Sequence, residues 1–66
     1  MKLFEVMTVE GAKEWLNPAR VIRVTSGQSG SPEEAGLWLA DYPGKVMLVR
    51  SSPQALTALV NAALVG

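Results

Sequence analysis

The chain has 66 residues and contains neither cysteine nor histidine. At this size folding buries only about 60% of the surface that the unfolded chain exposes, so small domains usually need a disulfide, a metal ion or a partner as well as a core. Without cysteine no disulfide can form, and a cysteine-rich zinc site is excluded. The sequence therefore predicts one domain, residues 1–66, held together by a strongly apolar core or by contact with a second chain.

Composition narrows the class of protein. Six Lys+Arg balance six Asp+Glu, which argues against a strongly basic nucleic-acid binder. With 48% hydrophobic and 18% charged residues, the chain is too apolar to be disordered. Met1–Glu5 shows no secretory signal, and the apolar stretch 55–65 is shorter than the ~20 residues that cross a bilayer. We therefore expect a cytoplasmic protein without a membrane partner.

Turn residues divide the first two thirds of the chain into short apolar segments. Gly11 suits a three-residue hairpin loop, Asn17–Pro18 favours a turn, and Pro43–Gly44 matches the centre of a type II turn. The second segment also contains good helix formers, but Pro18 limits a helix there to about one turn. We predict strands at residues 2–8, 12–16, 21–25, 37–42 and 45–50.

A polar loop and a final helix complete the predicted order. Residues 26–36 read as a loop, in which Ser31–Glu34 has the spacing of a capping box for one helical turn. Ser52 and Pro53 are typical of a helix start, which predicts a helix over 53–65. The fold class expected is α+β, mostly β: an antiparallel four- to five-stranded sheet or half-barrel with a C-terminal helix. Its predicted contacts join Leu56, Leu59, Val60 and Ala63 of the helix to Ile22 and Val24 of the sheet.

No catalytic constellation can be assembled from these residue types. Ser-His-Asp and Cys-His arrangements are impossible without histidine and cysteine, and no base is at hand to activate Ser29. Glu33 and Glu34 are adjacent and diverge, and Glu10 and Glu14 lie across the first hairpin turn. We predict no catalytic residue, no metal ligand and no cofactor. Glu5 is expected to pair with Lys13 across the first two strands.

Basic residues support an alternative function. Arg20, Arg23, Lys45 and Arg50 would form a nucleic-acid-binding surface if they gathered on one side of the sheet, with Trp38 or Tyr42 as a stacking platform. The opposing interpretation places Trp38 in the core or an interface, and arginines at sheet edges, where charge discourages aggregation.

Two segments have distinctive turn and cap residues: Leu16-Asn17-Pro18-x-x-Val21-Ile22-x-Val24 and, after a hairpin, Val49-Arg50-Ser51-Ser52-Pro53. In these segments the chain resembles the small FlbD-like family of bacterial and phage proteins. The resemblance implies a strand-rich body with an Asn-Pro turn and a Ser-capped closing helix, and it brings an association with flagella and swarming but no catalytic residues. The loop at residues 26–36 and the very apolar last helix depart from the family pattern. The CsrA-type RNA-binding regulators, also five strands and a helix, are a topological alternative.

The last helix suggests self-association. Its polar residues, Gln54, Thr57 and Asn61, form one narrow stripe, whereas a surface helix usually exposes a wider polar face. We therefore expect a non-enzymatic protein-interaction module, a small bacterial or phage accessory protein that binds a protein partner and forms a homodimer. The interface candidates are Ala58, Ala62, Leu64, Val65 and Trp38.

Overall fold

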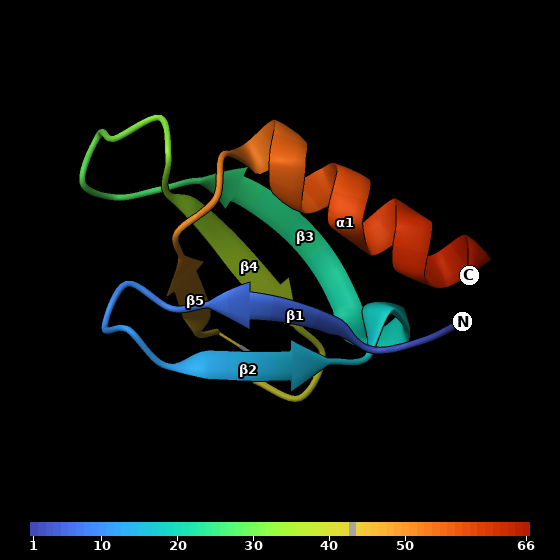
Figure 1. Cartoon of the computed structure of the whole chain (residues 1–66). Coiled ribbons are helices and arrows are strands. Elements are labelled where there is room, and N and C mark those ends of the chain that lie inside the picture. The colour runs from blue at the N-terminus through green and yellow to red at the C-terminus, as the bar shows by residue number, and fades with distance from the viewer. Residues whose placement is uncertain (43) are drawn as a thin grey trace.

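The computed structural model describes residues 1–42 and 44–66 and contains five strands and a C-terminal helix (Figure 1). The predicted fold class, α+β and mostly β, is confirmed. None of the helices in these residues is long and apolar enough to cross a membrane. In chain order the elements are β1 (Phe4–Met7), β2 (Lys13–Leu16), the 3₁₀ turn η1 (Pro18–Arg20), β3 (Val21–Ser26), β4 (Ala35–Leu39), β5 (Val46–Val49) and α1 (Pro53–Val65).

β1 and β2 form an antiparallel hairpin. Its turn is closed by a hydrogen bond from the Thr8 N–H to the Ala12 carbonyl at 2.8 Å, and Gly11 has the positive φ, +95°, that this turn requires. The three-residue loop was predicted, but the pairing of Glu5 with Lys13 was wrong. This loop sets a register in which Glu5 lies opposite Trp15, and Lys13 lies opposite Met7.

β3, β4 and β5 form a second antiparallel sheet, in that order. β4 begins at Ala35 and ends at Leu39, so the strand predicted at 37–42 starts earlier and stops where the chain turns. The helical turn predicted from the capping-box spacing of Ser31–Glu34 does not form. This segment contains a non-helical turn, because the chain enters β4 at Ala35. Gly44 has the positive φ, +77°, of the predicted type II turn, whose Pro43 lies outside the described residues.

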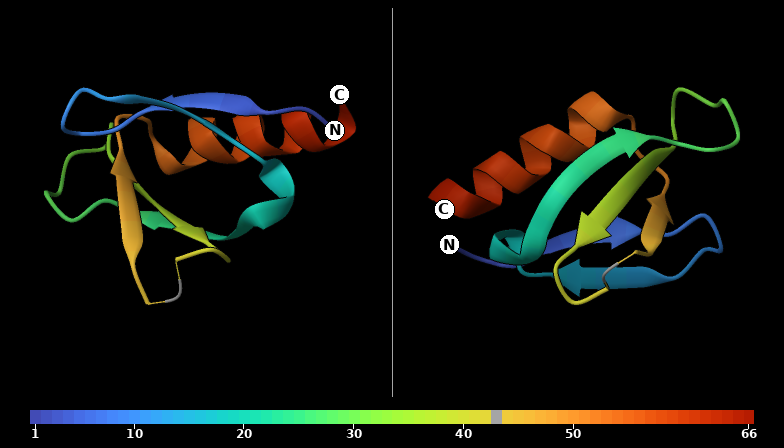
Figure 2. Two further views of the ribbon diagram at one scale, coloured as in Figure 1. Left: turned by 90° about the horizontal axis from the view of Figure 1, so that it is seen from below. Right: turned by 180° about the vertical axis from the view of Figure 1, so that it is seen from behind.

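The two sheets join at one end and diverge from there. Thr8 and Val49 form an antiparallel bridge, flanked by hydrogen bonds from the Val9 N–H to the Leu48 carbonyl and from the Arg50 N–H to the Met7 carbonyl. Beyond this join, β5 leaves the plane of the β1–β2 hairpin (Figure 2). The two-stranded and the three-stranded sheet are thus held together at this join, and both contribute residues to one core.

α1 packs over the core beside β3 and also contacts η1, β1 and β4. The Ser52 hydroxyl accepts the Ala55 N–H at 3.1 Å, and Pro53 occupies the first turn, as the sequence predicts. The residues α1 buries are Leu56, Val60 and Ala63. They join a core formed with Phe4, Val6, Ala35, Leu37, Leu39 and Val49.

Two predicted core contacts are wrong. Leu59 is 42% exposed because the buried seam of α1 follows positions 56, 60 and 63, and Leu59 lies at its margin. Ile22 is 63% exposed because the register of β3 against β4 shifts between Val21 and Arg23, which leaves Ile22 unpaired. Val24 does pack against the core, as predicted.

Candidate functional site

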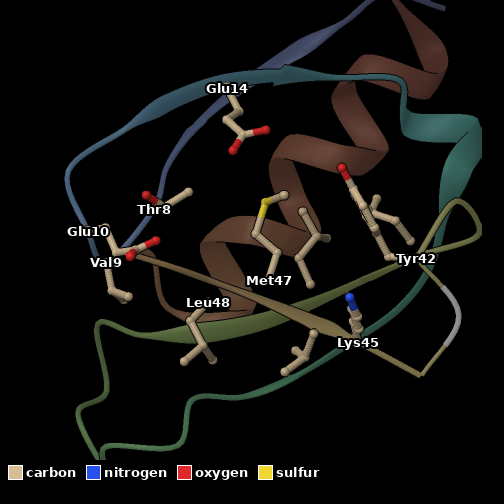
Figure 3. Close-up of a pocket in the computed structure, with 11 residues that line it drawn as sticks. Thr8, Val9, Glu10, Glu14, Tyr42, Lys45, Met47 and Leu48 are labelled. Atoms are coloured by element: carbon tan, nitrogen blue, oxygen red, sulfur yellow. The ribbon is translucent and has the colours of Figure 1, made fainter.

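A groove of about 530 Å³ opens between the β1–β2 hairpin and the β4–β5 hairpin (Figure 3). It lies next to the Thr8–Val49 join, because Thr8, Val9 and Leu48 are among its lining residues. Its lining residues come from three segments: Thr8, Val9, Glu10 and Glu14; Leu37, Leu39 and Tyr42; and Lys45, Val46, Met47 and Leu48.

The floor of the groove is apolar. Leu37 and Leu39 point to the core face of β4, and Met47 lies opposite Leu37 on β5, so these three side chains share one face. Leu37 and Leu39 are buried, whereas Met47 is half-buried and projects into the groove. A bound apolar side chain would therefore meet a preformed apolar surface.

Charged side chains border this floor on opposite walls. Glu14 points into the groove from β2, Glu10 lies apart from it next to Val9 on the hairpin loop, and Lys45 approaches from the β4–β5 side (Figure 3). Within the part of the chain that the structure describes, the ion pair formed is Arg20–Asp41, so neither glutamate is paired with Lys45. The groove thus carries two carboxylates and one ammonium group that have no ionic partner among the described residues.

The loop that carries Glu10 is held by Thr8. The Thr8 hydroxyl accepts the Ala12 N–H at 3.1 Å, and the Gly11 N–H donates to the Thr8 carbonyl at 2.9 Å. Thr8 is buried at the base of this turn. Its hydrogen bonds therefore fix the loop against the rest of the hairpin.

An unpaired stretch of strand edge runs along the groove. The Leu48 carbonyl accepts the Val9 N–H, so the Leu48 N–H also points toward the β1 side, because both groups of one residue face the same side of an antiparallel strand. The Val46 carbonyl, two residues away, has the same direction. After Val9 the first hairpin turns away, and the Leu48 N–H has no partner among the described backbone groups.

The four helical interface candidates are all exposed, but they do not share one face. Because successive residues of a helix turn by about 100°, Ala58, Ala62 and Val65 lie together on the side of α1 away from the buried seam, whereas Leu64 lies apart from them on a flank of that seam. Trp38 lies elsewhere, on the outer face of the three-stranded sheet, opposite Val46. The structure does not bring Trp38 together with the helical residues.

The four cations of the alternative site are spread along the molecule. Arg20 pairs with Asp41 at 3.1 Å, and Arg50 donates to the Val9 carbonyl at 2.9 Å at the opposite end of the sheet. The Arg23 guanidinium lies 5.0 Å from the centre of the Trp38 ring, in cation–π contact. Lys45 borders the groove with Tyr42.

The polar loop uses its acidic residue structurally. The Glu34 carboxylate accepts the N–H groups of Gln28 and Ser29 at 2.7 and 2.9 Å. These hydrogen bonds, that from Ser29 foremost, lower the pKa of Glu34 below its ordinary value. The Ser29 hydroxyl accepts the Ser31 N–H at 3.4 Å, so it belongs to the same loop network. Among the described residues no three carboxylates gather to hold a metal ion.

Sequence reasoning missed the groove. The sequence indicates only that Glu10 and Glu14 lie across the first hairpin turn and that Met47 belongs to the strand predicted at 45–50. Comparison of the chain with protein-family models, with curated proteins and with solved structures gave no match. The resemblance to the FlbD-like family therefore stays a hypothesis.

Proposed function

We propose that this chain is a non-enzymatic protein-interaction module that binds a partner protein in the groove between the two hairpins. The observation that carries the proposal is the pairing of an apolar floor with charges that have no internal ionic partner. Apolar contact supplies affinity, and unpaired charges at the rim supply orientation and specificity. In the setting implied by the FlbD-like resemblance, the module is a small bacterial or phage accessory protein.

The distribution of charge favours a protein partner over nucleic acid. A nucleic-acid surface needs cations arranged to replace phosphate counterions. Here Arg20 is balanced by Asp41, Arg50 is engaged at a backbone carbonyl, and the groove itself carries two glutamates against one lysine. These features oppose phosphate binding at the groove.

Differential affinity capture tests the proposal. The immobilised full chain is compared with two charge-reversal variants, Glu14→Lys in the groove and Glu33→Lys in the exposed polar loop. Both variants change the net charge by the same amount, so Glu33→Lys controls for general electrostatic effects. Captured proteins are identified from nuclease-treated lysate of the cell that produces the chain, then purified and titrated.

We expect a protein that the wild type and Glu33→Lys capture and that Glu14→Lys loses. Equal capture by all three chains would place binding outside the groove and overturn the proposal. Capture of nucleic acid, with affinity falling steeply as salt rises, would overturn it in favour of the alternative.

A further inference from the structure

We propose that the partner segment is an extended peptide that adds as a short strand to the open edge of β5, with an apolar side chain on the groove floor and a Lys or Arg beside it. This inference rests on the proposed function and specifies the chemistry that the groove recognises. It combines three observations: the free edge, the apolar floor and the position of the two glutamates.

The strand edge calls for a peptide backbone. The Leu48 N–H and the Val46 carbonyl point to the β1 side of β5, where the first hairpin has already turned away at Val9. An extended segment placed there would accept from Leu48 and donate to Val46, and would continue the ladder begun at the Thr8–Val49 bridge. Strand addition of this kind obtains its affinity from main-chain hydrogen bonds.

The floor selects the side chain that faces inward. Alternate residues of an added strand point to the same face of the sheet as Met47 and Leu37. A peptide residue at that position would cover the half-buried Met47 side chain. With a volume of about 530 Å³, the groove has room for a few side chains, not for a folded domain.

The charges select what lies next to the apolar residue. Glu10 and Glu14 stand on the hairpin wall, and Lys45 on the other wall, with none of the three in the ion pair found among the described residues. A Lys or Arg on the bound peptide would meet Glu14 or Glu10 according to its position, and the excess of these two carboxylates over Lys45 makes the groove net acidic. The complementary ligand is therefore basic as well as apolar.

A random twelve-residue peptide library selected on the full chain supplies the probe. We expect enriched peptides that carry an apolar residue with Lys or Arg one or two positions away. When one enriched peptide is synthesised and titrated, we expect Glu14→Lys to weaken its binding about 3- to 10-fold and Glu33→Lys to change it less than two-fold. Binding of this peptide should slow hydrogen exchange of the Leu48 amide at least about ten-fold.

Backbone-modified versions of the same peptide separate strand addition from the broader proposal. N-methylation at each residue in turn removes one N–H donor, and methylation at the residue that donates to the Val46 carbonyl should weaken binding at least ten-fold. If groove variants weaken the peptide but no methylation does and Leu48 exchange is unchanged, strand addition is wrong and the protein-binding groove stands. If no selected peptide responds to Glu14→Lys, both proposals fail.

Discussion

The indole N–H of Trp38 donates a hydrogen bond of 3.0 Å to the Thr25 hydroxyl, across the outer face of β3 and β4. Trp38 lies opposite Arg23 and Val46, and Thr25 lies opposite Gly36. A methyl group at Gly36 would come within 2.6 Å of the Thr25 hydroxyl oxygen, so glycine leaves the space beside this bond. The half-buried Trp38 is thus held by its hydrogen bond to Thr25 and by the Arg23 guanidinium over its ring.

Thr25→Val tests the contribution of that hydrogen bond. Valine keeps the shape of threonine but removes the acceptor, which leaves the indole N–H without its partner. We expect a loss of about 0.5–1.5 kcal/mol in the free energy of unfolding, measured by urea denaturation. Thr57→Val on the exposed face of α1 is the control, with a change within about 0.5 kcal/mol. Equal losses in both variants would show that the bond contributes nothing specific.

The polar loop should depend on pH through Glu34. Because hydrogen bonds from Ser29 and Gln28 lower the pKa of this carboxyl in the folded chain, its contribution is complete above the unfolded pKa and is lost as pH falls through the folded pKa. NMR of the Gln28 and Ser29 amides should show one acid transition, with a midpoint below the ordinary value of 4.5. Glu34→Gln should remove that transition. A midpoint at or above the ordinary value would contradict the hydrogen-bonded carboxylate.

Two leucines on α1 should differ sharply in their effect on stability. Leu56 is fully buried in the core, and Leu59 is 42% exposed. Leu56→Ala leaves a cavity and should cost about 2–5 kcal/mol, whereas Leu59→Ala should cost less than about 1 kcal/mol. Thermal or urea unfolding measures both. Similar costs would mean that Leu59 is buried in solution, by the core or by a second chain.

Self-association through α1 remains our prediction. Val65 is 90% exposed and Leu64 43% exposed at the end of the helix. Burial of such residues against a second copy would stabilise a dimer, so light scattering at micromolar concentration should give twice the 7.0 kDa chain mass. Leu64→Glu should weaken the dimer, and Asn61→Asp on the polar stripe should leave it intact. A 7.0 kDa species throughout would refute the dimer.

Local signals were sufficient to predict the elements. Gly11 sets the first hairpin loop, Asn17 caps η1 by accepting the Ala19 N–H, and Ser52 caps α1. Each of these effects acts within a few residues, so it can be read from neighbouring letters of the sequence. The same holds for five strands followed by one helix as the order of the fold.

Relationships between distant segments could not be read in this way. The exposure of Leu59 depends on the angle at which α1 meets the core, and that of Ile22 on a register shift in β3. The groove is a space between two sheets, and its glutamates become neighbours of Met47 through the packing of those sheets. The pKa of Glu34 is likewise lowered because the loop folds back and brings the N–H groups of Ser29 and Gln28 to its carboxylate.

The join between the two sheets also governs the order in which the chain should fold. The β1–β2 hairpin and the β3–β4–β5 meander each connect segments close in sequence, whereas the Arg50–Val9 contact at the join spans 41 residues. Closing a long loop costs more entropy, and contacts of high sequence separation slow folding. We therefore expect the hairpin and the meander to form early, and their docking to limit the refolding rate. The groove lies between them, so we expect a nascent chain to acquire the groove only in that final step.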